Sequence, residues 1–318
     1  MRKTTALVAA LLAVAGLLAC APQGYAQDAP PGRSATRQAA GACAPASNGN
    51  ALRMWYTQPG SPDSWENTAL VIGNGTTGAI LFGQPEREQI HFNDKTLWNG
   101  GPAPSRPSYD GGNRDVAVTK GQLDALRTKL DDHTTSIFPL GTNTPQEVWG
   151  DGDGMGSYQD FGDLLLDFSA SAAPLDQAED YVRDLDLTTG TVSVHFNAGG
   201  VHYERHYFAS HPDGVVAIRL EASEPGMLSF DLTARAAQGL ACTARAEGRA
   251  LTLSGAVIDN GMRCEMQARV VADGGSVEAD PAGHLRVRNA DAVTIVYATG
   301  TDYQNDLSRL TVAGNLPR

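Results

Sequence analysis

The chain has 318 residues, and its 36 Asp and Glu residues outnumber its 24 Lys and Arg residues, which gives a formal net charge of −12. This balance excludes nucleic acid as the default partner, because phosphate binding needs a positive surface that releases counterions. An apolar share of 42 % excludes a wholly disordered chain. The length fits one large domain or two ordinary ones.

The N-terminus has the layout of a secretory signal. Arg2 and Lys3 precede an uncharged, mostly apolar run that extends from Thr4 to Ala21. No charged stop follows this run, so we expect export and not a membrane-spanning helix. Two processing sites are possible. Cleavage after Ala26 would define a signal peptide over residues 1–26, whereas a bacterial lipobox that ends at Cys20 would leave Cys20 lipidated. We therefore expect the protein to be periplasmic, to be an outer-membrane lipoprotein or to be secreted. Its only contact with the membrane would be through this lipid.

Residues 27–50 are expected to form a disordered linker. The stretch is built mainly from Ala, Pro, Ser and Gly and has no large apolar residue, so it cannot bury enough surface to offset the entropy of ordering. The folded part is expected over residues 51–305, followed by a divergent tail over residues 306–318.

The sequence of the folded part predicts an all-β fold, namely a large antiparallel β super-sandwich with one short connecting helix. Short β-type runs, several of which alternate apolar and polar residues, are separated by Gly, Asn, Asp and Pro. Gly73-Asn-Gly75 is interpreted as a hairpin turn and not as a phosphate loop, because no Lys-Ser/Thr follows it. The clearest strands are expected over residues 192–196, 202–208, 215–220, 227–232, 250–254, 264–271, 285–288 and 292–297.

One helix is expected, from Thr119 to Asp131. Thr119 is its candidate cap, and Leu123, Leu126 and Leu130 fall on one face. A single helix among so many strands indicates a connection and not a layer of the fold.

Several polar groups receive structural interpretations. Asp151 and Asp153 resemble the start of a calcium loop, but Gly162 stands where that loop needs a carboxylate. The carboxylates Asp160, Asp163 and Asp167 are expected in a solvated loop. We expect no catalytic constellation, no metal site and no cofactor.

His202 and His206 have a spacing that would suit zinc on a helix. On a strand they point the same way but stand about 13 Å apart, so they cannot share one ion without further ligands. The neighbouring Glu204 and Arg205 are interpreted as ordinary cross-strand charge pairing.

The segment from Ile90 to Pro102 is dense in polar and aromatic residues. Asn93, Trp98 and Asn99, beside two glycines, are candidate carbohydrate-facing residues, because an exposed indole can stack on a sugar. The alternative is that Trp98 and Leu97 fill the core beneath a glycine-rich turn.

Two of the four cysteines, Cys242 and Cys264, lie in the folded part and are candidate disulfide partners in an oxidising compartment. Sequence alone does not show that their Cα atoms come close enough.

Several short motifs keep one order along the chain: Met54-Trp-Tyr56, Ala69-Leu-Val-Ile-Gly-Asn-Gly75, Gly78-Ala-Ile-Leu-Phe-Gly83, Asn93-Asp-Lys-Thr-Leu-Trp-Asn-Gly-Gly-Pro102, Gly156-Ser-Tyr158, Phe161-Gly-Asp-Leu164, Tyr181-Val-Arg-Asp-Leu-Asp186, Phe208-Ala-Ser-His-Pro212 and Thr301-Asp-Tyr303. This ordered set resembles the N-terminal β domain of glycoside hydrolase family 95, the α-L-fucosidase family. The resemblance extends from about Leu52 to Tyr303.

The resemblance implies an exported, inverting α-L-fucosidase that acts on fucosylated oligosaccharides or glycans. It also implies a partner, the helical (α/α)6 catalytic barrel that holds the family's catalytic carboxylates. No catalytic residue transfers to a position of this sequence, so the chain alone is expected to be inactive. The alternative function is a non-catalytic, exported β-sandwich that binds carbohydrate or serves as a scaffold.

Overall fold

A computed structural model describes residues 52–101, 103, 105, 120–132 and 156–303. The expected signal peptide, Cys20, the linker, Thr119, the Asp151 loop and the C-terminal tail lie outside the described residues. Among the residues described, no helix is long and apolar enough to span a membrane.

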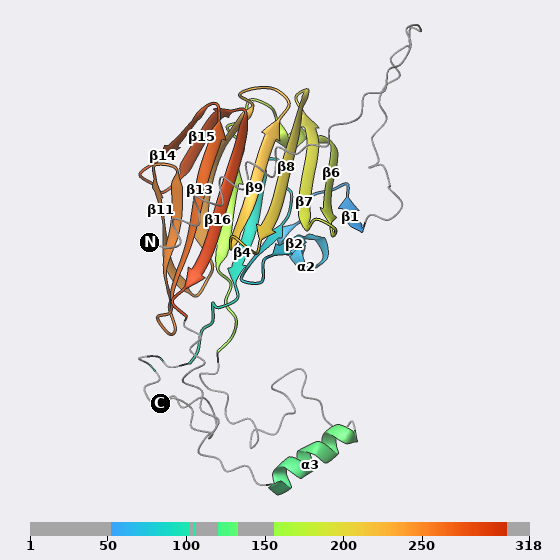
Figure 1. Ribbon diagram of the computed structural model, residues 1–318, viewed down its shortest axis with the longest axis vertical. Helices are drawn as coiled ribbons and strands as arrows, with labels where there is room; N and C mark the ends of the chain where they lie inside the picture. The colour runs from blue at the N-terminus through green and yellow to red at the C-terminus, as the bar shows by residue number, and fades with distance from the viewer. Residues whose placement is uncertain (1–51, 102, 104, 106–119, 133–155, 304–318) are drawn as a thin grey trace.

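Two antiparallel sheets pack face to face (Figure 1), which confirms the predicted all-β sandwich. The nine-stranded sheet has the order β1-β6-β7-β8-β9-β16-β13-β12-β11. Its strands are β1 (Arg53–Tyr56), β6 (Glu179–Asp186), β7 (Thr191–Ala198), β8 (Val201–Ser210), β9 (Val215–Ala222), β16 (Ala292–Thr301), β13 (Arg263–Asp273), β12 (Ala250–Val257) and β11 (Leu240–Glu247).

The seven-stranded sheet has the order β14-β15-β10-β5-β4-β3-β2. Its strands are β14 (Ser276–Ala279), β15 (Leu285–Ala290), β10 (Leu228–Ala236), β5 (Gly162–Asp167), β4 (Arg87–Asp94), β3 (Thr77–Leu81) and β2 (Leu70–Gly73).

The core lies between the sheets and is built by alternation along the strands. On β8, Tyr203 and Tyr207 point inward and are buried, whereas His202 and Glu204 face outward and are half-buried. Phe92 of β4 contacts Tyr297 of β16 across the interior, with ring centroids 5.8 Å apart. These contacts join the two sheets through aromatic side chains.

Every strand expected between residues 192 and 297 is present, and Gly73-Asn-Gly75 does form the turn of the β2–β3 hairpin. Strands β1, β4, β5, β6, β11 and β14 were not predicted. The expectation of a solvated loop was wrong for Asp163 and Asp167, which lie on β5. Asp163 is only 7 % exposed, because the central strand β5 pairs with both β4 and β10.

The connecting helix is confirmed as α3 (Lys120–Asp131), which Figure 1 shows apart from the two sheets. Leu123, on the face predicted to be apolar, is 37 % exposed. The other described helical segments are short: η1 (Pro62–Ser64), α2 (Trp65–Thr68) and η2 (Leu175–Gln177).

An ion pair lies inside the sandwich, between Glu88 of β4 and Arg205 of β8. Both residues are buried, with Arg205 Nη1 3.5 Å from Glu88 Oε2. The expectation of ordinary cross-strand charge pairing was therefore wrong for Arg205, whose partner lies in the other sheet. Position 205 has the inward parity of Tyr203 and Tyr207, so the guanidinium enters the core while Glu204 stays at the surface.

Candidate functional site

An open groove lies at one end of the sandwich, where the segment after β4, the β12–β13 turn and the end of β16 meet. Its volume is about 800 Å³, and its lining includes Trp98, Asn99, Asn260, Met262 and Tyr303. Both apolar and hydrogen-bonding groups line this surface. Such a mixture suits a ligand that offers both hydroxyl groups and apolar faces.

Trp98 is presented to solvent by its neighbour Leu97. Leu97 is fully buried, whereas Trp98 is 46 % exposed, so the core alternative is right for Leu97 and wrong for Trp98. The indole ring packs against Tyr158, with ring centroids 5.6 Å apart and planes tilted by 54°. Its Nε1 donates to the carbonyl of Lys95 at 3.1 Å, which fixes the ring orientation. The two rings together form a partly exposed aromatic surface.

Buried polar contacts hold this segment against the nine-stranded sheet. The carboxylate of Asp94 accepts hydrogen bonds from the Thr96 backbone N–H (2.9 Å), the Thr96 hydroxyl (2.6 Å) and the Thr299 hydroxyl (2.8 Å). The hydroxyls of Thr96 and Thr301 lie 2.6 Å apart. The turn that presents Trp98 is thus tied to β16, which makes the groove a preorganised surface.

Asn99 lines the groove, but its side chain also supports the groove wall. Its Oδ1 accepts from the backbone N–H of Ser157 at 2.6 Å. Gly156 precedes this contact with φ +83°, and a side chain there would collide with the Asn99 carbonyl, so glycine is required at this position. Asn260 Nδ2 adds donors to the Trp98 and Gly100 carbonyls, both at 3.0 Å.

Asn93 is placed differently from the other two candidates. It lies on β4 opposite Gly78 of β3, and it is not among the residues that line the groove. The structure therefore brings Trp98 and Asn99 together and leaves Asn93 outside. Carbohydrate contact by these residues stays a prediction.

Three residues in or beside the groove were not predicted as site residues: Tyr158, Tyr303 and Asn260. Tyr158 and Tyr303 are 47 % and 53 % exposed. Each of these two tyrosines is the last residue of a motif in the ordered family set. Aromatic residues within those motifs were therefore the signal that could have identified them as site residues. Asn260 follows β12 in a turn and carried no such signal.

A second polar cluster lies on the outer face of the seven-stranded sheet. His91 Nδ1 lies 2.9 Å from Asp163 and its Nε2 lies 3.0 Å from Asp160. Asp163 also accepts from Gln89 at 2.8 Å and forms an ion pair with Arg235. Hydrogen bonds to the two carboxylates raise the pKa of His91 to about 9.

The same contacts make Asp163 a poor general acid. Burial acts to raise its pKa, but hydrogen bonds from His91 and Arg235 outweigh that effect, so the pKa is lowered. A glycosidase acid needs a raised pKa to hold its proton near neutral pH. We therefore interpret this cluster as structural.

Because the folded-state pKa of His91 lies above the value of about 6.5 expected for the unfolded chain, this pairing stabilises the fold fully below pH 6.5. The contribution is lost as the pH rises through about 9. We expect His91→Gln to lose about 1–2 kcal/mol at pH 6, after allowance for solvent access to the ring, and almost nothing at pH 10. Urea unfolding at both pH values measures this difference; an equal loss at both would contradict the pairing.

The two candidate disulfide partners face each other across strand β12. Gly255 of β12 pairs with Cys242 of β11 on one side and with Cys264 of β13 on the other. Because glycine has no side chain, the two sulfur atoms approach to 3.4 Å over it, and both thiols are free. Burial and the neighbouring Cys242 raise the pKa of the Cys264 thiol to about 12. The disulfide stays a prediction.

The predicted disulfide between Cys242 and Cys264 can be tested by non-reducing mass spectrometry of protein isolated from an oxidising compartment. We expect a peptide pair joined through Cys242 and Cys264, with a mass lower by two hydrogens than that of the reduced peptides. Cys264→Ser is the control and should abolish the pair. Recovery of both cysteines as free thiols from that compartment would contradict the prediction.

Comparison of the sequence with known protein families identifies the family of this domain. A family model described as "Glycosyl hydrolase family 65, N-terminal domain" matches residues 54–306. The match does not separate family 65 from family 95, whose motifs the sequence resembles.

The curated relatives that match carry α-fucosidase names. The chain is 31 % identical over 262 residues to "Probable alpha-fucosidase A" of Aspergillus niger, covering 80 % of this chain and 31 % of that protein. It is 33 % identical over 174 residues to "Alpha-L-fucosidase 2" of Arabidopsis thaliana, covering 55 % of this chain and 19 % of that protein. It is 27 % identical over 256 residues to "Probable alpha-fucosidase A" of Aspergillus oryzae, covering 79 % of this chain and 33 % of that protein.

The chain thus spans at most about a third of the length of these curated relatives. The family match covers both sheets of the sandwich and the groove at its end. The chain therefore belongs to the family of glycosyl hydrolase N-terminal domains described by the family 65 model.

Proposed function

We propose that this chain is the N-terminal β-sandwich of an exported glycoside hydrolase that removes terminal α-linked L-fucose from glycans with inversion. The alignment with the Aspergillus niger protein, named an α-fucosidase, supports it best, since it covers 80 % of this chain. The alignment covers only 31 % of that relative, and on this proposal the catalytic carboxylates lie in a helical barrel outside the aligned region.

On this proposal the chain by itself does not hydrolyse fucosides. Inversion needs a general acid and a general base on opposite sides of the scissile bond, each with access to the sugar or to water. Glu88, whose burial raises its pKa to about 7, lies inside the sandwich, where no sugar reaches it. Asp163 has a lowered pKa and is held by several donors.

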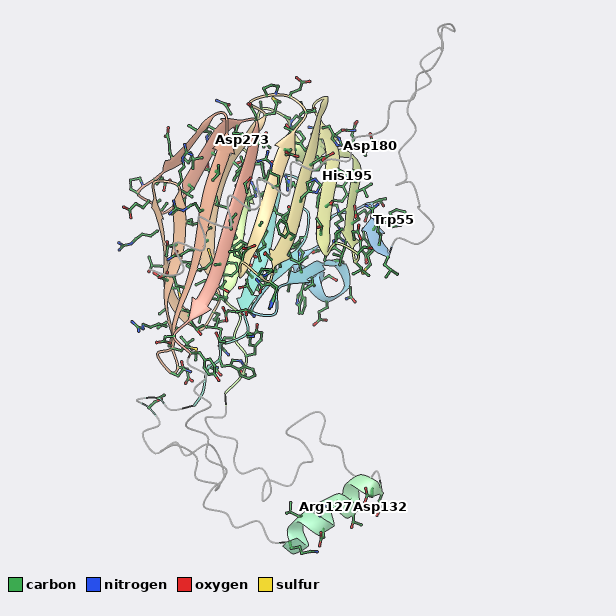
Figure 2. All side chains as sticks on the ribbon, viewed as in Figure 1. Trp55, Arg127, Asp132, Asp180, His195 and Asp273 are labelled. Atoms are coloured by element: carbon green, nitrogen blue, oxygen red, sulfur yellow. The ribbon has the colours of Figure 1, made fainter. Side chains whose placement is uncertain are left out.

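The edge of the nine-stranded sheet offers a surface for the catalytic partner. Strand β1 is exposed along its whole length, and Figure 2 shows Trp55 at this flank of the sandwich. Trp55 is 54 % exposed and Leu187, just beyond β6, is 53 % exposed. Aromatic and aliphatic groups concentrated at a sheet edge are characteristic of a surface that another domain covers.

Coding DNA downstream of codon 318 tests the division of labour. We expect it to encode a helical barrel, in the same frame or another. An unrelated gene at that position, with no barrel gene elsewhere in the operon, would contradict the proposal and favour a free-standing domain.

Export is proposed from the N-terminal sequence, with two alternatives for processing. Cleavage after Ala26 leaves Gln27 as the first residue, whereas lipoprotein processing leaves a lipidated Cys20. Intact-mass measurement on protein from the producing cells distinguishes the two. Full-length protein that retains Met1 in the cytosol would contradict export.

A second candidate function, glycan binding by the groove, is favoured by the exposed pair of Trp98 and Tyr158. Titration with a fucosylated oligosaccharide should change the Trp fluorescence of the wild-type chain. Trp98→Ala should weaken binding by about tenfold or more, as expected for loss of an aromatic anchor. Trp65→Ala is the matched control, because Trp65 is 49 % exposed and does not line the groove. An unchanged spectrum in the wild type would count against binding.

A further inference from the structure

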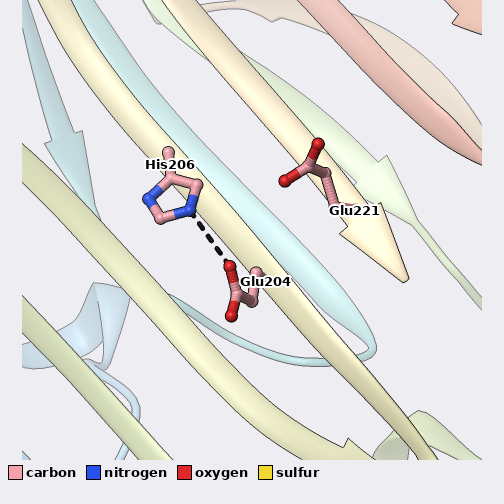
Figure 3. A group of neighbouring side chains, drawn as sticks. All are labelled: Glu204, His206 and Glu221. Carbon is pink, nitrogen blue, oxygen red and sulfur yellow. Dashed lines mark hydrogen bonds and ion pairs between the residues drawn. The ribbon is translucent and has the colours of Figure 1, made fainter. Parts of the chain in front are cut away.

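A group of metal-ligating side chains lies on the outer face of the nine-stranded sheet, away from the groove. Glu204 and His206 of β8 and Glu221 of β9 each offer a ligand atom, and these atoms all lie within 4.8 Å of one another. Figure 3 shows the three side chains on the two neighbouring strands, with a dashed line joining His206 to Glu204. The side chains are between 30 % and 45 % exposed, so water and ions reach them.

Two carboxylates face each other directly in this group. Glu204 and Glu221 are register partners across the β8–β9 ladder. Like charges opposite each other destabilise an antiparallel pair, so a cation bound between them would relieve the repulsion. One guanidinium, Arg219, is present, but it is shared between Glu221 (3.0 Å) and Asp273 (3.0 Å). Three carboxylates and one guanidinium together carry a charge of −2, which one divalent cation would balance.

The histidine is oriented as a metal ligand. Its Nδ1 lies 3.1 Å from the hydroxyl of Ser193 on β7, which leaves Nε2 facing Glu204. A hydrogen bond at the other ring nitrogen is the usual arrangement for a histidine bound to metal, because it fixes the tautomer and the ring plane. His202 and His206 were not expected to share an ion, and the group around His206 instead contains Glu204 of the same strand and Glu221 of the next.

The spacing of His206 and Glu204 suits zinc. In a tetrahedral site with bonds of about 2.1 Å, neighbouring ligand atoms lie about 3.4 Å apart. His206 Nε2 and Glu204 Oε2 lie 3.4 Å apart. Glu221 is held through one oxygen, Oε1, by Arg219 and keeps its second oxygen for the metal. We propose that Glu204, His206 and Glu221 bind one Zn²⁺ ion, with the remaining position open to water.

The site joins two central strands of the sheet and opens beside a cavity of about 370 Å³, which Glu204 and Glu221 help to line. Bound zinc therefore stabilises the sandwich and offers an exchangeable coordination position to a carboxylate or other oxygen ligand. His202, whose Nε2 lies 3.2 Å from Glu204 Oε1, holds that carboxylate from its far side. The proposal does not depend on fucosidase activity.

Calorimetric titration of the whole chain with ZnCl₂ tests the site, after EDTA treatment and after alkylation of the thiols, because cysteines elsewhere would compete. We expect one equivalent bound by the 204/206/221 site and a higher thermal unfolding midpoint when zinc is present. His206→Gln and Glu221→Gln should each weaken this binding by at least about tenfold. His284→Gln is the matched control, since His284 is an exposed histidine paired with Asp280 on another strand region, and it should bind as the wild type does.

Cobalt gives an independent readout that does not depend on the stability of any variant. Co²⁺ bound to the wild-type chain should show the visible absorption of a nitrogen- and oxygen-ligated low-symmetry site, and Zn²⁺ should displace it. Absence of zinc binding by the wild type, or binding by both variants equal to that of His284→Gln, would overturn the proposal.

Discussion

Arg205→Ala is expected to lower the free energy of unfolding by about 3–5 kcal/mol, because it leaves a buried carboxylate without its counter-charge. Arg205 is only 3 % exposed and donates to the carbonyl of Gln84 at 2.8 Å and to that of Pro85. Its guanidinium lies over the Phe168 ring, 4.3 Å from the centroid. Alanine removes the charge, two carbonyl partners and the packing at once. Urea unfolding at pH 7.5 measures the loss.

Matched variants separate these contributions. Arg87→Ala removes an exposed arginine of β4, the strand that carries Glu88. It should change the free energy of unfolding by less than about 1 kcal/mol. The double variant Glu88→Leu with Arg205→Met should recover most of the loss, since apolar residues of similar volume often replace a buried ion pair without cost. A loss in Arg205→Ala no larger than that in Arg87→Ala would contradict the buried pair.

The pH dependence of Arg205→Ala follows from the protonation of Glu88. Burial raises the Glu88 pKa to about 7, while Arg205 acts to lower it. The folded state therefore binds a proton that the unfolded chain has released above about pH 4.5, and stability falls as the pH rises through this window. Removal of Arg205 extends the fall to higher pH. We expect the variant to lose less stability, relative to the wild type, at pH 5 than at pH 8; equal losses would show that packing alone is responsible.

Phe92→Ala is also expected to lower the free energy of unfolding by about 3–5 kcal/mol. Phe92 is completely buried, with its ring 5.2 Å from that of Phe161 and 5.8 Å from that of Tyr297. Because Phe161 adjoins β5 of one sheet and Tyr297 belongs to β16 of the other, alanine opens a cavity at the contact between the layers.

Thermal and urea unfolding measure this effect. Phe92→Leu, which keeps most of the volume, should lose clearly less than Phe92→Ala. Tyr303→Ala is the exposed control and should stay within about 0.5 kcal/mol of the wild type. A loss from Phe92→Ala as small as that of Tyr303→Ala would show that the sheets do not depend on this aromatic contact.

Alternation of apolar and polar residues predicted eight strands between residues 192 and 297, but not β11 or β14 in the same range. It did not predict β5, because Asp163 and Asp167 within Gly162–Asp167 resemble a polar loop. It also misassigned Arg205, because a charged residue at an inward position needs a buried partner, and Glu88 lies 117 residues away in the sequence. Pairings at that separation are decided by the packing of the two sheets.

The groove was predictable only in its first segment. Trp98 and Asn99 stood out by composition, and their exposure depends on Leu97 taking the buried position beside them. Tyr158 and Asn260 come from segments distant in sequence, and only the folded chain brings them to the same place. Asn93 was a candidate by proximity in sequence, but strand parity places it and its buried neighbour Asp94 on opposite faces of β4.

The most direct test of the proposed role is an assay of the purified 318-residue chain on an aryl α-L-fucoside. We expect release of the aryl group no faster than in a buffer blank. Turnover above the blank by the chain alone, at a rate proportional to its concentration and retained after a second purification step, would contradict the account.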